Sequence, residues 1–90
     1  MNECKLIGYY NDFEDIKYLA DKSADEIVAY FRDGFGAFMS SEEYMDLYLG
    51  GWNVEVTTDG KYAVVKDINY CDDFTNLDKN DCYIDIYELL

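Results

Sequence analysis

The spacing of apolar residues changes along the chain and predicts two kinds of secondary structure. Cys4–Tyr10 is short and rich in residues that favour strands, so it predicts a first strand. From Asp12 to Asp21 the apolar residues, among them Ile16 and Leu19, recur at helical spacing with charged residues between them. That spacing places the apolar side chains on one face of a short helix.

Two Ser-x-x-Glu sequences mark the starts of two further predicted helices. The first, Ser23–Glu26, begins a helix that Gly34 ends, and the second, Ser40–Glu43, begins a helix that ends at Gly50. In such a capping box the serine hydroxyl and the glutamate carboxylate accept hydrogen bonds from backbone N–H groups that the first turn leaves unpaired. The first half of the chain is therefore expected to hold one strand and three helices.

The second half alternates with period two, as strands do. Trp52–Thr58 and Lys61–Asp67 flank Asp59-Gly60, a dipeptide that suits a type I′ hairpin turn, in which both central residues have positive φ. Counting outward from this turn places Val54 opposite Val65. The face expected to lie on the core consists of Trp52, Val54, Val56, Ala63 and Val65.

Beyond an Asp-rich connection, alternation resumes in Cys82–Tyr87, which predicts a last strand. The predicted order is β-α-α-α-β-β-β. This order predicts an α+β fold, with two or three short helices packed on one face of a small antiparallel sheet of about four strands. The sequence has no repeat, no proline and no linker-like tract, so residues 1–90 are expected to form a single domain.

The charge of the chain narrows the classes of function. It has 20 Asp and Glu residues against 7 Lys and Arg, a net charge of −13. Binding to nucleic-acid phosphates or to anionic membranes depends on Lys and Arg, and the single arginine is Arg32, so both kinds of partner are disfavoured. The cysteines have no CxxC spacing, which indicates reduced thiols. The segments without a charge are far shorter than the roughly 20 residues of a membrane-spanning helix, so the sequence predicts a cytoplasmic protein.

The sequence lacks the usual signatures of catalysis and of cofactor binding. The chain has no histidine, the commonest general base and transition-metal ligand, and no glycine-rich phosphate loop. An EF-hand loop beginning at Asp78 fails, because Tyr83 stands in place of the glycine and Leu89 in place of the glutamate. The sequence therefore predicts a protein that is not an enzyme and uses no cofactor and no metal, with loose cation binding by the acids of Asp72–Asp81 as an alternative.

The acidic residues are distributed through the predicted elements rather than gathered in a tail. On the predicted helices they lie opposite the apolar stripes, where carboxylates three or four residues apart are about 5–6 Å from one another. Successive phosphates of one DNA strand advance about 3.4 Å along the axis on a longer helical path, so the two spacings are comparable. The acids expected to contact a partner are Glu14, Asp21, Asp25, Glu26, Glu42, Glu43, Asp46, Asp72 and Asp73.

In length, net charge and distribution of these acids, the chain resembles the small acidic inhibitors of phages and mobile elements, the anti-CRISPR and antirestriction proteins, several of which mimic DNA. The resemblance implies a non-enzymatic inhibitor that blocks the basic DNA-binding channel of a bacterial defence nuclease, such as a CRISPR effector or a restriction enzyme, in the cytoplasm of the host cell. The 10 tyrosines also favour a protein partner, because tyrosine is enriched at protein interfaces.

Two other interpretations fit the same composition. An immunity protein or antitoxin that neutralises a basic nuclease toxin shares the small size, the acidity and the tyrosine content. An excess of acidic residues also serves solubility alone in many small domains. Both interpretations stay open on the sequence.

Overall fold

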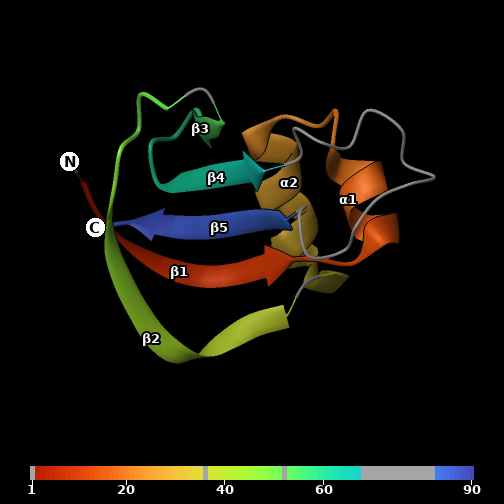
Figure 1. Cartoon of the computed structure of the whole chain (residues 1–90), viewed down its shortest axis with the longest axis horizontal. Helices are drawn as coiled ribbons and strands as arrows, with labels where there is room; N and C mark the ends of the chain where they lie inside the picture. Colours follow the sequence, from red (N-terminus) through yellow and green to blue (C-terminus); the bar gives the residue numbers. More distant parts are fainter. Residues whose placement is uncertain (1, 36, 52, 68–82) are drawn as a thin grey trace.

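The computed structural model of the chain describes residues 2–35, 37–51, 53–67 and 83–90. In these residues, five antiparallel strands form one sheet in the order β2-β1-β5-β4-β3, and two helices pack on it (Figure 1). The strands are β1 (Asn2–Tyr10), β2 (Ala37–Leu47), β3 (Val54–Val56), β4 (Tyr62–Asp67) and β5 (Tyr83–Leu89). The helices are α1 (Phe13–Leu19) and α2 (Ala24–Tyr30), and α2 continues into a π-helical turn, η1 (Phe31–Phe35). The α+β prediction is confirmed, although the sheet has one strand more than predicted.

The first two predicted helices form, and the second begins at its predicted capping residue, Ser23. Asp12 caps α1, because its Oδ1 accepts a hydrogen bond from the Glu14 N–H at 3.0 Å. Ser23 caps α2: its Oγ accepts a hydrogen bond from the Glu26 N–H at 3.2 Å and lies 3.1 Å from Glu26 Oε1, to which it donates. Gly34, at φ 96°, ends the helical segment in a conformation that glycine adopts without strain.

The third predicted helix is wrong, because the segment after the second Ser-x-x-Glu sequence lies in strand β2. This strand pairs with β1 in antiparallel register, with Met45 opposite Cys4. A helix there would have gathered Tyr44, Met45 and Tyr48 on a buried face, yet these side chains are 51%, 46% and 67% exposed. Pairing with β2 satisfies the backbone groups on the edge of β1 that β5 does not cover. The observed order is β-α-α-β-β-β-β.

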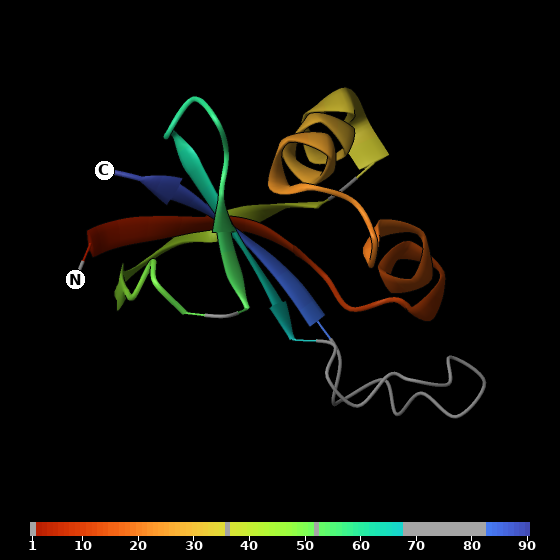
Figure 2. The same cartoon turned by 90° about the horizontal axis from the view of Figure 1, so that it is seen from above.

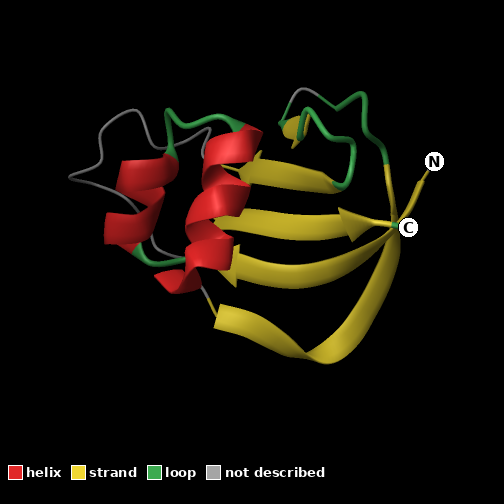
Figure 3. Ribbon diagram, turned by 180° about the vertical axis from the view of Figure 1, so that it is seen from behind, coloured by secondary structure: helices red, strands yellow, loops and turns green. Residues whose placement is uncertain are grey.

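Both faces of the sheet carry a buried apolar cluster. Helix α2 lies across one face of the sheet, and α1 packs beside α2 past the ends of the strands, as Figure 2 and Figure 3 show. The helix-side core includes Ile16, Leu19, Ile27, Phe31, Val64, Ile84 and Ile86. The second core, on the helix-free face, consists of Cys4, Leu47, Ala63, Val65 and Tyr87, with partly buried residues around it. The prediction that helices lie on one face of the sheet is therefore confirmed.

The hairpin face predicted to lie on the core is buried, but in the second core and not under the helices, and its Trp52 lies outside the described residues. Ala63 and Val65 are buried in the second core, whereas Val64, between them, contacts the helices. The sequence could not reveal this, because both faces of β4 are apolar and alternation alone does not show which face the helices cover.

The second core is enclosed by the two edge strands and the chain between them. Strands β2 and β3 lie at opposite edges of the sheet, yet they are consecutive in the chain, and residues 48–51 after β2 run along one end of the sheet (Figure 1). Leu49 of this connection, with Val54 and Val56 of β3, packs against the second core. The sheet thus buries its helix-free face against its own edge strand and connection.

The β3–β4 hairpin has the predicted register but not the predicted turn. Its strands pair as expected from the sequence. A type I′ turn needs positive φ at both central residues. Gly60 has φ 72°, but no described non-glycine residue has positive φ. Asp59 therefore does not fit a type I′ turn. Instead, the Gly60 N–H donates to the Thr57 carbonyl at 2.9 Å. The Asp59 Oδ1 holds the turn by accepting hydrogen bonds from Thr57 Oγ1 at 2.6 Å and from the Lys61 N–H at 2.9 Å.

Replacing Val65 by threonine tests whether the helix-free face is a buried core. Val65 is 8% exposed, and threonine keeps its shape while adding a hydroxyl group to the second core. We expect Val65→Thr to lower the free energy of unfolding by about 1–3 kcal/mol, the cost of burying a polar group with incomplete compensation. Urea denaturation measures this change. Glu88→Thr, at an exposed strand position, is the control, and a Val65→Thr effect as small as the control's, within about 0.5 kcal/mol, would contradict a buried second core.

Candidate protein-binding surface

The acids predicted to contact a partner fall into three groups in the structure. Asp21, Asp25 and Glu26 lie in or just before the first turn of α2, Glu14 lies in the first turn of α1, and Glu42, Glu43 and Asp46 lie on β2. Asp72 and Asp73 lie outside the described residues. Those of the predicted acids that the structure describes therefore do not form one continuous array.

The acids of β2 do not form the helical row that the sequence predicted. Side chains alternate across a strand, so Glu43 and Asp46, three residues apart, point to opposite faces of the sheet. In the register with β1, Glu43 lies opposite Leu6 and Asp46 lies opposite another acid, Glu3. The prediction of an acidic helix face over residues 42–46 is wrong because the strand replaces the helix.

Asp25 attaches the first turn of α2 to the β3–β4 hairpin. Its Oδ1 accepts hydrogen bonds from the Thr58 N–H at 3.0 Å and from Thr58 Oγ1 at 3.2 Å. One residue earlier in the helix, the Ala24 N–H donates to Oε2 of Glu55, on β3, at 2.8 Å. Because these partners are 31 and 33 positions apart in sequence, the bonds fix the start of the helix against the hairpin.

These contacts bring four carboxylates to one region, and we name Asp25, Glu26, Glu55 and Asp59 the α2–turn acidic surface. Hydrogen bonds from Thr57 and Lys61 lower the pKa of Asp59 below its ordinary value, so this carboxylate is ionised at neutral pH. The sequence identified Asp25 and Glu26 as candidates but not Glu55 and Asp59. No local pattern indicates those two, because packing between segments distant in sequence brings them to α2.

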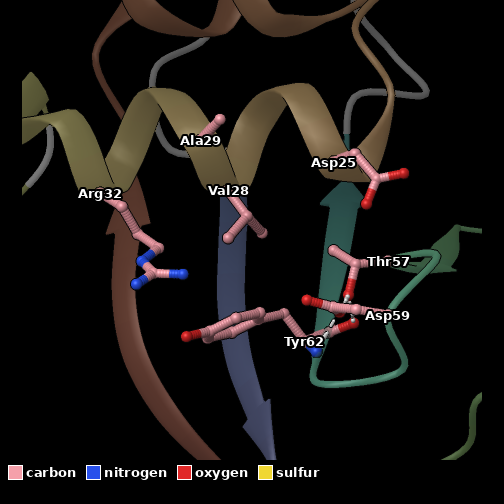
Figure 4. Close-up of a pocket in the computed structure, with 7 residues that line it drawn as sticks. All are labelled: Asp25, Val28, Ala29, Arg32, Thr57, Asp59 and Tyr62. Carbon is pink, nitrogen blue, oxygen red and sulfur yellow. Dashed lines mark hydrogen bonds between the residues drawn. The ribbon is translucent and has the colours of Figure 1, made fainter.

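A pocket of about 150 Å³ opens between the helix and the hairpin beside this surface (Figure 4). It is lined by Asp25, Val28, Ala29 and Arg32 from the helical segment and by Thr57, Asp59 and Tyr62 from the hairpin. In Figure 4, Arg32 lies at one end, the carboxylates of Asp25 and Asp59 lie at the other, and Val28 and the Tyr62 ring lie between them. Pockets for small-molecule substrates are typically about 300–1,000 Å³, so this one is sized for a single side chain.

Arg32 contacts the aromatic part of the pocket. Its guanidinium carbon lies 5.8 Å from the centroid of the Tyr62 ring, within the range of a cation–π interaction. Within the described part of the chain, Arg32 forms no ion pair. The single arginine of a strongly acidic protein is thus directed at a pocket and a ring rather than at a carboxylate.

A second group of acids, Glu43, Asp67 and Asp85, lies on the helix-free face. The Tyr87 hydroxyl lies near Asp85, and the Tyr83 hydroxyl lies near Asp67. Burial raises the pKa of Asp85 to about 6, with a further contribution from the charges of Asp67 and Glu43, although the nearby Tyr87 hydroxyl acts in the opposite direction. Asp85 is therefore a carboxyl group whose protonation changes just below neutral pH.

The described residues show no metal site, no membrane-spanning helix and no reactive thiol. No group of three or more Cys, Asp or Glu side chains among them is arranged to hold a metal ion. Of the helices in the described ranges, none is long and apolar enough to cross a membrane. Cys4 is a buried thiol whose pKa is raised by burial first and by the charges of Asp46 and Glu3 to a smaller extent, as expected for an unreactive cysteine.

Comparison with protein-family models, with curated proteins and with solved structures gives no match for this chain.

Replacing Asp85 by asparagine tests the effect of its raised pKa. The folded-state pKa of about 6 lies above the ordinary value of 3.8, so the native state binds the proton more tightly than the unfolded state does. Stability from this group is present at low pH and is lost as the pH rises through about 6. We expect Asp85→Asn, which keeps an acceptor for the Tyr87 hydroxyl, to be more stable than the parent by on the order of 1 kcal/mol at pH 7 and equal to it at pH 4.

Thermal unfolding at both pH values measures this difference. The control is Asp46→Asn, which removes the same charge from an exposed position. If Asp46→Asn stabilises the protein as much as Asp85→Asn does at pH 7, then relief of the overall negative charge accounts for the effect, and the burial of Asp85 does not.

Proposed function

We propose that the chain is a non-enzymatic inhibitor that occupies the basic nucleic-acid-binding channel of another protein, such as a CRISPR effector or a restriction enzyme. The observation that supports this most strongly is the α2–turn acidic surface, where carboxylates from two distant segments meet beside a pocket of side-chain size. Because Asp25 and Asp59 already accept hydrogen bonds from the turn, they lose little side-chain freedom when cations of a partner bind them.

The net charge of −13 supports the same function over longer distances. A basic channel built for nucleic acid attracts an acidic protein through the same field, and such steering raises association rates by roughly 10–10³-fold. Nucleic acid and the acidic protein then compete for one set of lysine and arginine side chains. Inhibition of this kind is stoichiometric and weakens as salt rises.

The acids assigned to the contact differ in part from those predicted. Asp25 and Glu26 remain in the contact, and Glu55 and Asp59 of the hairpin join them. Glu43 and Asp46 face opposite sides of the sheet, so in this proposal they strengthen the attractive field without forming one contact surface.

Competition with DNA identifies the partner and tests the function. The chain is immobilised, a bacterial lysate treated with nuclease is passed over it at low salt, and bound protein is eluted with a double-stranded oligonucleotide. We expect elution of a basic nucleic-acid-binding protein whose DNA binding is abolished by an equimolar amount of the chain. If DNA elutes nothing, or if the eluted protein binds DNA fully in the presence of excess chain, the proposal is wrong.

A matched pair of triple variants locates the contact on that partner. The first variant is Asp25→Asn, Glu26→Gln and Asp59→Asn, which keeps the acceptor oxygens that hold the helix and the turn. The second variant is Glu14→Gln, Glu43→Gln and Asp46→Asn, which changes the net charge equally. Since an exposed ion pair contributes about 0.2–1 kcal/mol, we expect the first to weaken binding about tenfold and the second less than about threefold. Equal weakening would contradict a contact at the α2–turn acidic surface.

A further inference from the structure

The pocket beside the α2–turn acidic surface has a charge of opposite sign at each end. Asp25 and Arg32 are seven residues apart on one helical segment, which places their Cα atoms about 10 Å apart along the axis. Val28 and Ala29 lie between them on the same face and line the pocket. Opposite this face, the hairpin contributes the Tyr62 ring and the Asp59 carboxylate.

The two carboxylates are positioned and still have accepting capacity. Oδ1 of Asp25 is bonded to Thr58, and Oδ1 of Asp59 is bonded to Thr57 and to the Lys61 N–H. Among the described residues, no hydrogen bond reaches the Oδ2 atom of either aspartate. Asp25 and Asp59 both line the pocket, and their carboxylates lie at the end opposite Arg32 (Figure 4).

The volume sets the size of the group that fits. Since water occupies about 30 Å³ in the liquid, a pocket of about 150 Å³ has room for about five waters, or for the guanidinium group of an arginine and the methylene beside it. A planar guanidinium offers five N–H donors to two carboxylates and stacks on an aromatic ring, and its aliphatic stem packs on apolar side chains. These are the groups that line this pocket.

We propose that this pocket binds an arginine side chain of the partner, with the guanidinium between Asp25 and Asp59 and the stem along Val28 and Ala29. Arg32, at the opposite end, opposes entry of a second cation. The inference rests on the proposed function only in assigning the arginine to a partner. The affinity of the pocket for arginine can be measured on the chain alone.

The probe is N-acetyl-arginine N-methylamide, compared with its lysine counterpart at the same low ionic strength by NMR of the backbone amides. We expect saturable shifts at Ala29, Thr58 and Lys61 with a Kd on the order of 1 mM, the strength typical of a ligand of this size. The lysine compound, which offers a point charge in place of a planar fork, is expected to bind at least about fivefold more weakly.

Conservative variants assign the binding to the two aspartates. Asp25→Asn and Asp59→Asn keep the oxygens that hold the turn and are each expected to weaken binding of the arginine compound about tenfold. Glu14→Gln makes the same change in charge on α1 and is expected to leave the Kd unchanged. Absence of saturable shifts up to about 20 mM, equal binding of the two compounds, or equal weakening by Glu14→Gln would each overturn the assignment.

The outcome separates this inference from the proposed function. If the chain captures a basic nucleic-acid-binding partner but does not bind the arginine compound, the pocket assignment is wrong and the proposed function stands. If it binds the arginine compound but DNA elutes no partner from it, the pocket assignment stands and the proposed function is wrong.

Discussion

The attachment of the first turn of α2 to the β3–β4 hairpin is the interaction on which the acidic surface depends. A helix of seven residues is too short to be stable alone, since isolated helices need about 12–15 residues even in favourable sequences. Two sets of contacts stabilise this helix. The first is the buried stripe that includes Ile27 and Phe31. The second is a pair of hydrogen bonds between helix and hairpin, in which Glu55 of β3 accepts from the Ala24 N–H and Asp25 accepts from the Thr58 N–H. In a chain of net charge −13, carboxylates that accept backbone hydrogen bonds reduce the cost of packing like charges together.

The predictions that succeeded were those in which a local signal and tertiary packing agree. Ser23 caps a helix because Ala24, Ile27 and Phe31 behind it are fully buried against the sheet. The second Ser-x-x-Glu sequence has the same local form, but Tyr44 and Met45, which follow it, remain exposed. No buried face is therefore present to stabilise a helix there. Pairing with the edge of β1 then decides the conformation. A capping sequence followed by an apolar stripe therefore specifies a helix only where tertiary packing also buries that stripe.

The candidate site could be predicted only in part, for a related reason. Asp25 and Glu26 are recognisable because acids opposite an apolar stripe must face outward on a helix. Asp59 is recognisable as a turn residue, but nothing near it in sequence shows that the turn lies against α2. The residues that line the pocket depend on which face of the hairpin meets the helices. The sequence does not show which face that is, because consecutive residues of β4 are apolar.

The acids of this surface stabilise the fold and also form the proposed contact with a partner. This double role affects the entropy that each carboxylate side chain loses when a cation binds. Ordering a long charged side chain costs up to about 1.5–2 kcal/mol in rotamer freedom. Asp25 and Asp59 lose that freedom when the protein folds, because the turn holds them. Glu14, which accepts no hydrogen bond from the described residues, must lose it on binding. Carboxylates of equal charge therefore differ in the side-chain entropy that they lose on binding a cation. The acids that stabilise the fold lose least, because folding has already ordered them.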